Sequence, residues 1–249
     1  MIRWQLLAIT PRSHVAYPSE LTLRLLRLAL AIFLFHALWT AVEPGAAPEL
    51  LAYSAFGVAL QFLAPPMRDR FGERVRDGSA AYVFARPVPP QRVQLWADTG
   101  TVALGSTCVV FVMAVGTAVH LLPTRPLSHL LLLLAFAVPS AATAALIVQL
   151  VEVSTVWLRD NQGLRLLVPF VSTLLSGTLV PLDICPGWFR TTADFLPFRS
   201  MVDVPVRVYL HGLSGPGPIV TSLGWLAVLA LVTRSAWKAA GRRMEVQGG

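Results

Sequence analysis

Apolar stretches of about 20 residues, the length of helix that crosses the roughly 30 Å hydrocarbon core of a bilayer, recur along this chain. Backbone groups inside hydrocarbon must be hydrogen-bonded internally, and a helix achieves this within one segment. The chain is therefore predicted to be an all-α membrane protein with six transmembrane helices. Its composition, 55% hydrophobic and 13% charged, agrees with that class. The predicted spans are 26–42, 49–66, 93–121, 127–155, 164–182 and 218–237.

The basic residues predict which side of the membrane each loop faces, because lysine and arginine near span ends are retained in the cytoplasm. If both termini are cytoplasmic, 16 of the 20 basic residues fall in cytoplasmic segments or at the cytoplasmic ends of the spans. This orientation gives a cytoplasmic N-terminal segment (1–25) and a six-helix transmembrane domain (26–249). Within that domain, residues 67–92 are cytoplasmic and residues 183–217 are external. The external segments hold only Arg125, Arg190, Arg199 and Arg207.

The net charge of +7 would suggest nucleic-acid binding in a soluble chain. Here the basic residues lie at predicted membrane edges, where they contact anionic lipid headgroups. We therefore expect membrane lipid, and no nucleic acid, among the partners. Arginine outnumbers lysine 19 to 1, which indicates a GC-rich genome and hence a multi-pass protein of a bacterial plasma (inner) membrane.

Signatures of catalysis and of nucleotide binding are incomplete. The run Gly-Leu-Ser-Gly at 212–215 resembles the serine motif of intramembrane rhomboid proteases, but no histidine follows Ser214 to activate it. A phosphate-binding Gly-x4-Gly-Lys-Ser/Thr loop is absent, and Lys238 is the only lysine. Cysteine and histidine residues at metal-ligand spacing are also missing. We expect no enzyme, no metal and no cofactor in this chain, and a role in passage, scaffolding or sensing.

A few residues inside the spans predict a route for a substrate. His36 is a polar group in the first span, where such groups are costly and often functional. Phe33 and Phe56 are single aromatic residues able to contact a greasy molecule. Ser172 and Ser176 are small and allow helix backbones to approach closely. Ordinary packing or lipid contact is the alternative for each of these residues. No carboxylate lies at the middle of a predicted span, which disfavours a proton-driven carrier.

The external segment 183–217 is too apolar for an ordinary loop and is divided by prolines. Backbone that dips into hydrocarbon must bond internally or rest against protein. We therefore predict short amphipathic or re-entrant helices that cap the outer end of the bundle. Prolines end helices because they lack a donor and clash with the preceding turn. The predicted external gate consists of Pro181, Pro186, Trp188, Pro197 and Phe198.

A longer pattern includes this region and consists of Ser176, Gly177, Pro181, Leu182, Pro186, Trp188, Leu196, Pro197, Phe198, Pro205 and Gly212. The pattern resembles that of the permease subunits of type-2 (ABC-2) ATP-binding-cassette exporters. The run VRDGSAAYVFARPVPP at 75–90 is similar to that family's inner loop. The resemblance implies a half-transporter: two permease chains, alike or different, each contacting a separate ATPase subunit that holds ATP and magnesium. A secondary ion-coupled transporter and a non-transporting scaffold or sensor are the alternatives.

Residues 67–92 are predicted to couple such an ATPase to the membrane helices. Met67, Phe71 and Val75 recur at i, i+4 and i+8 and form an apolar stripe, and Gly78 marks a helix end. Charges crowd the rest of this helix, yet each pair contributes only about 0.2–0.5 kcal/mol. Because these ion pairs are too weak to stabilise the helix appreciably, the charges favour a surface that docks a partner protein. The alternative is a solvated helix that rests on lipid. The predicted coupling residues are Phe71, Glu73, Arg74, Arg76, Asp77 and Gly78.

Overall fold

The computed structural model of the chain describes residues 18–67, 70–84, 88–118, 123, 125–158 and 160–247. The first 17 residues of the predicted N-terminal segment and five residues of the predicted coupling segment (68–69 and 85–87) lie outside this part. No strand occurs within the described residues. Their helices are α2 (Pro18–Val42), α3 (Ala47–Gln61), α4 (Arg70–Arg76), α5 (Ala80–Phe84), α6 (Pro90–Ala118), α7 (Leu127–Val153), η1 (Ser154–Val156), α8 (Gln162–Leu175), α9 (Gly187–Asp194), η2 (Pro197–Met201), α10 (Asp203–His211) and α11 (Gly217–Gln247).

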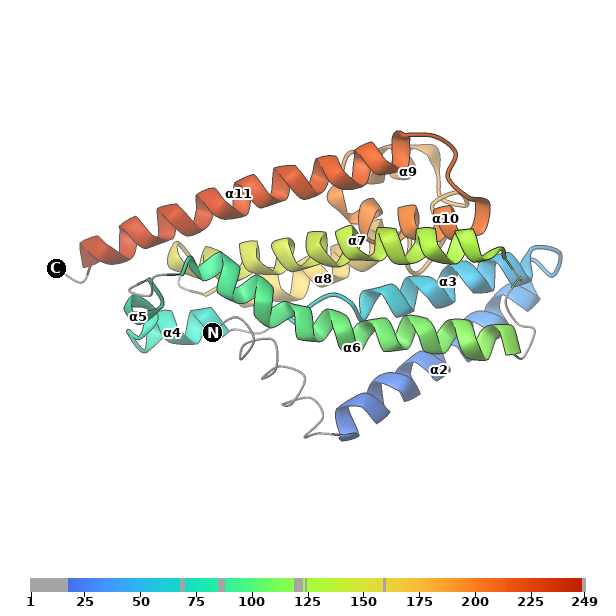
Figure 1. The fold of residues 1–249 in the computed structure, drawn as a ribbon, viewed down its shortest axis with the longest axis horizontal. Coiled ribbons are helices and arrows are strands. Elements are labelled where there is room, and N and C mark those ends of the chain that lie inside the picture. The colour runs from blue at the N-terminus through green and yellow to red at the C-terminus, as the bar shows by residue number, and fades with distance from the viewer. Residues whose placement is uncertain are drawn as a thin grey trace.

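Four of these helices are long and apolar enough to cross a membrane. Leucine and alanine, both strong helix formers, dominate the most apolar of them, α7. In Figure 1, α6, α7 and α11 run along the long axis of the molecule, and α2 lies at an angle to them. The chain is therefore a multi-pass, all-α membrane protein. The four candidate spans are Thr22–Val42, Pro90–Thr117, Leu127–Val156 and Gly217–Met244.

The second and fifth predicted spans correspond to shorter helices. α3 has 15 residues and α8 has 14, so at 1.5 Å per residue each extends about 21–23 Å, less than the roughly 30 Å of hydrocarbon. α3 ends before the pair Pro65-Pro66. α8 ends just before Gly177, whose φ of +83° favours glycine because a Cβ would be strained there. Four of the six predicted spans thus have the length of a complete crossing, and α3 and α8 alone do not.

The largest buried cluster surrounds α3, which packs against α2 and α6. Phe56 on α3 and Tyr209 on α10 are both buried, and their ring centroids lie 4.6 Å apart. At Gly105, α6 meets the end of α3 so closely that a Cβ would lie 2.7 Å from the carbonyl carbon of Phe62 and 2.8 Å from the Cα of Leu63. Glycine therefore sets the distance between these two elements.

Residues 183–217, which are predicted to be external and are called the external segment below, form α9, η2 and α10, in agreement with the predicted series of short helices. α10 packs against α7 and α3 and buries Val206 and Tyr209 within the bundle. Pro186 directly precedes α9, and Pro197 is the first residue of η2. At a helix start the missing N–H of proline needs no intrahelical acceptor. These two prolines therefore begin helices, whereas we expected them to end helices.

The remaining predicted gate residues lie in different environments. Phe198 packs beside Leu146 and Leu229, at the contact between α7 and α11. Pro181 is buried. Trp188 is 73% exposed on α9. The five predicted gate residues are thus divided between the interior and the surface.

α4 and α5 pack against one end of the bundle, close to the last turns of α11 (Figure 1). Phe71 on α4 is 4% exposed, and its ring centroid lies 4.8 Å from that of Trp237 on α11. Phe84 on α5 lies 6.1 Å from Phe71 and 6.2 Å from Trp237, again between ring centroids. Val75 packs against the same cluster. Met67, the first member of the predicted apolar stripe, instead packs against a separate cluster on α7 and α11. These three rings, the aromatic clamp, hold the coupling segment on α11.

Candidate functional site

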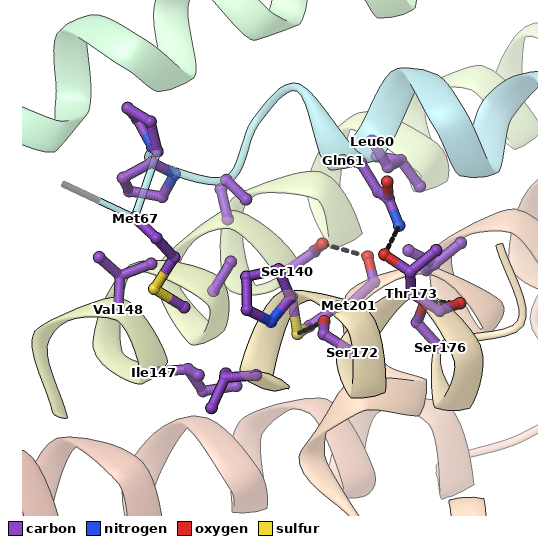
Figure 2. A pocket seen from close by; sticks show the side chains of 18 residues that line it. Leu60, Gln61, Met67, Ser140, Ile147, Val148, Ser172, Thr173, Ser176 and Met201 are labelled. Atoms are coloured by element: carbon purple, nitrogen blue, oxygen red, sulfur yellow. Dashed lines mark hydrogen bonds between the residues drawn. The ribbon is translucent and has the colours of Figure 1, made fainter. Parts of the chain in front are cut away.

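A cavity of about 260 Å³ lies between α3, α7, α8 and η2 (Figure 2). Because it touches both short helices, we name it the α3–α8 cavity. None of its lining side chains carries a charge. Its lining residues are Leu60, Gln61, Ala64, Pro65, Pro66, Met67, Ser140, Ala141, Ala144, Ile147, Val148, Val168, Pro169, Ser172, Thr173, Ser176, Met201 and Val202.

Gln61 supplies the main polar contact at one edge of the α3–α8 cavity. Its Nε2 donates hydrogen bonds to Thr173 Oγ1 and to Thr178 Oγ1, each at 3.0 Å. The hydroxyls of Ser176 and Thr178 lie 2.8 Å apart and bond to each other. The end of α3 is thereby tied to the end of α8 through uncharged groups, which are less costly than charges in a membrane interior.

Met201 of η2 closes another side of the cavity (Figure 2). The Ser140 hydroxyl on α7 donates a hydrogen bond to the Met201 carbonyl oxygen. The Ser172 hydroxyl on α8 lies 3.8 Å from the Met201 sulfur. The external segment therefore reaches the cavity directly, and movement of η2 would change the volume of the cavity.

The structure separates the residues predicted to form a translocation path. Ser172 and Ser176 line the α3–α8 cavity. Phe33 is 66% exposed, and His36 is also exposed on the same helix, α2. Phe56 is fully buried against Tyr209. The sequence thus pointed to two cavity residues through their small size. It did not place Gln61 in the path, because the partners of Gln61 are more than 100 positions away in the chain.

A chain of ion pairs, absent from the sequence-based hypotheses, holds the external segment together. Asp203, 0% exposed, accepts hydrogen bonds from Arg199 Nε at 2.8 Å and from Arg207 Nε at 2.7 Å. It also accepts one from the Tyr53 hydroxyl on α3 at 2.6 Å. The spacing of Arg199, Asp203 and Arg207 at i, i+4 and i+8 is a signal that sequence reading could have used.

This ion-pair chain continues outward on both sides. Arg199 pairs with Asp194, and Arg207 Nη2 lies 2.8 Å from Asp183 Oδ1. Arg190 also donates to Asp183, at 3.3 Å. Burial alone would raise the pKa of Asp183, but the hydrogen bonds and charges of Arg207 and Arg190 outweigh burial and hold that pKa below its usual range. Three carboxylates and three guanidinium groups thus alternate along the segment.

The predicted coupling residues form a surface next to the aromatic clamp. Phe71 is buried in the clamp, whereas Glu73, Arg74 and Arg76 are exposed. The exposed Asp77 accepts a hydrogen bond from the Ser79 backbone N–H at 2.8 Å, and hydrogen bonds with Ser79 lower the pKa of this carboxyl. Gly78 follows with a φ of +77° and ends the helical turn. One apolar anchor and several exposed charges on a short helix are suited to protein contact.

In the described part of the chain, no three His, Cys, Asp or Glu side chains gather in a way that could hold a metal ion. A comparison with family models matches residues 47–248 to the model described as ABC-2 family transporter protein. The match includes α3, the α3–α8 cavity, the coupling segment and the external segment. No curated protein matches the chain.

Proposed function

Because the chain belongs to the ABC-2 transporter family, we propose that this permease serves an ATP-driven exporter, working with a second permease chain and a separate ATPase subunit. The observation that carries the proposal is the family match over residues 47–248. The missing phosphate-binding loop supports it, because ATP and magnesium then belong to the partner. The same reasoning predicts that this chain is not itself an enzyme.

The proposed topology keeps six crossings with both termini in the cytoplasm of a bacterial inner membrane. α3 and α8 form the second and fifth crossings, extended by residues 62–67 and 176–182. These extensions are irregular, and irregular backbone is tolerated in a membrane where it is covered by protein. Pro65 and Leu182 are buried, which supports that cover. Cysteine labelling tests the orientation: Arg74→Cys should react only from the cytoplasm and Thr192→Cys only from outside.

The α3–α8 cavity is the proposed part of the translocation path within this subunit. Its uncharged walls suit a molecule, or a segment of one, that is apolar with a few hydrogen-bonding groups. Ser172 and Ser176 are placed to contact it, and η2 closes the path towards the outside. Phe33, His36 and Phe56 lie away from this cavity, so their proposed role is restricted to contacts with lipid, with the second chain or within the core.

The second permease chain is proposed to cover α8. No residue of α8 is fully buried, and the face that does not line the cavity is apolar. Leu166 is 69% exposed and Phe170 is 65% exposed. After replacement of Cys108 and Cys185, a Phe170→Cys chain should form a disulfide-linked dimer in membranes. The matched control is Leu231→Cys on α11, 66% exposed, which should stay monomeric. Equal cross-linking at both positions would contradict the assignment of α8.

The ATPase is proposed to dock on α4 and α5. The coupling residues would contact it with the exposed charges of Glu73, Arg74, Arg76 and Asp77, while Phe71 transmits its movement to α11 through the aromatic clamp. Co-purification tests this proposal. The tagged permease should retain a soluble ATPase, and the double reversal Glu73→Arg with Arg74→Glu should lose both the ATPase and export. A chain that transports without any ATPase would instead be a secondary carrier.

A further inference from the structure

A second cavity, of about 560 Å³, lies beside the aromatic clamp at the end of the molecule that carries α4 and α5. Basic residues from two helices line it. Arg92 comes from the first turn of α6, and Arg234, Lys238 and Arg242 recur at i, i+4 and i+8 on α11, so they share one face of that helix. Phe84, Pro89, Pro90, Gln91, Trp237 and Gly241 complete the lining.

The lining of this basic pocket offers donors without matching carboxylates. No aspartate or glutamate is among the lining residues, and within the described part of the chain none of the four cations has an ion-pair partner. Trp237 also lines the pocket and is 7% exposed. Four cations around one hollow favour an anionic ligand with several oxygen acceptors.

The position of the pocket in the membrane indicates which class of anionic ligand it binds. Both contributing helices are candidate membrane spans, and the pocket lies at the start of α6 and in the last turns of α11. The pocket therefore lies where a span meets the headgroup layer. Phe84 and the prolines Pro89 and Pro90 lie beside the cations and can contact the upper part of an acyl chain. Basic pockets between membrane helices are suited to anionic lipid headgroups. Its volume is within the range of small-ligand sites, about 300–1,000 Å³.

We infer that this pocket is a specific binding site for the phosphate headgroup of an anionic phospholipid. The lipid phosphate is held by Arg234, Lys238 and Arg242 from α11 and by Arg92 from α6. The upper part of an acyl chain rests against Phe84 and the proline pair. An occupied site joins α6 to α11 beside the aromatic clamp. This inference depends on membrane insertion alone and not on the proposed transport direction, substrate or ATPase.

The test uses the full chain in detergent and native mass spectrometry with three probes: short-chain phosphatidylglycerol, short-chain phosphatidylcholine and glycerol 3-phosphate. Phosphatidylglycerol should bind at least about tenfold more tightly than the other two. The double variant Arg234→Gln with Arg242→Gln should weaken phosphatidylglycerol binding about 25-fold, since each basic residue near a headgroup is worth about fivefold. The matched control is Arg243→Gln, an exposed arginine on the same helix outside the pocket lining, which should change binding less than about twofold.

Any one of three results would contradict the proposed lipid-binding site. Equal weakening by Arg243→Gln and by the double variant would show diffuse attraction between charges. Tight glycerol 3-phosphate binding would show a soluble phosphate ligand and not a lipid. If lipid binding were unchanged while ATPase co-purification failed, the pocket would be a protein-docking surface. A melting curve of the double variant that matches the wild-type curve shows that any loss of binding is not a loss of folding.

Discussion

Removing the carboxylate of Asp203 is expected to be among the most damaging single changes in the external segment. Asp203 is fully buried and accepts hydrogen bonds from Arg199, Arg207 and Tyr53 at 2.6–2.8 Å. Breaking a buried ion pair from one side costs about 3–5 kcal/mol, because the opposite charge is left unpaired. The two arginine side chains are 24% and 26% exposed, and each keeps another carboxylate partner. We therefore expect Asp203→Ala to cost about 3 kcal/mol.

Two variants along the same ion-pair chain provide matched comparisons. Tyr53→Phe removes one hydrogen bond to a charged group and should cost about 1.5–3 kcal/mol. Asp194→Asn removes a pair whose carboxylate is 43% exposed and should cost less than about 1 kcal/mol. For a chain of this size, 1 kcal/mol shifts the melting temperature by about 2–4 °C. Asp203→Ala should thus melt roughly 10 °C below wild type, and Asp194→Asn within about 3 °C of it.

The assay is thermal unfolding of purified protein in detergent, followed by intrinsic tryptophan fluorescence. Limited proteolysis of the external segment should show the same ranking, because loss of Asp203 frees α10 from α3. If Asp203→Ala and Asp194→Asn melted at the same temperature, burial would not determine the strength of these pairs, and the role assigned to the buried carboxylate would be wrong.

Three further predictions concern single positions. Gly105→Ala should destabilise by about 1–3 kcal/mol in the same melting assay, since a Cβ would lie 2.7 Å from the carbonyl carbon of Phe62; an unchanged melting temperature would contradict this close approach. Because its pKa is lowered in the folded state, the ionised Asp183 carboxylate stabilises the fold at pH values above its unfolded pKa of about 3.9. This stabilisation is lost as the pH falls through the folded pKa. The melting temperature should therefore decline below about pH 4, and it should decline less steeply in Asp183→Asn. Gln149→Met should raise the melting temperature, because the buried Gln149 amide has no hydrogen-bond partner among the described residues; destabilisation would indicate a bound water or partner there.

The long helices could be predicted from the sequence because a complete crossing depends on composition over one window. The two short helices could not, since apolar residues continue past their ends. Phe62 and Leu63 extend the apolar run beyond α3, and Leu179 and Val180 do the same beyond α8, so a hydropathy window counts turns and bends as helix. The local backbone at Gly177, with its positive φ, decides the end of α8, and such a choice is visible only in three dimensions.

In the candidate site, features that depend on neighbouring residues could be predicted from the sequence, whereas contacts between distant residues could not. Ser172 and Ser176 could be predicted because small residues on one face of a helix allow close packing. The spacing of Arg199, Asp203 and Arg207 is also local and readable. The partner Tyr53, however, lies 150 positions from Asp203, and Gln61 lies 112 positions from Thr173. With a single sequence, no pattern pairs residues at such separations.

The 31 residues of α11 form one continuous helix about 46 Å long, and its single proline, Pro218, lies in the first turn. Near one end Trp237 belongs to the aromatic clamp, and nearer its middle Leu229 packs with Phe198 of η2 and with α7. The helix therefore has the mechanics of a rigid lever with its fulcrum on α7. A tilt of a few degrees imposed at α4 would displace the two ends of α11 in opposite directions. The contact with Phe198 lies at the fulcrum and would move little, so most of the displacement would reach the start of α11 at Gly217. Transmission of this kind needs no refolding of any helix, only a change in the angle between two that already touch.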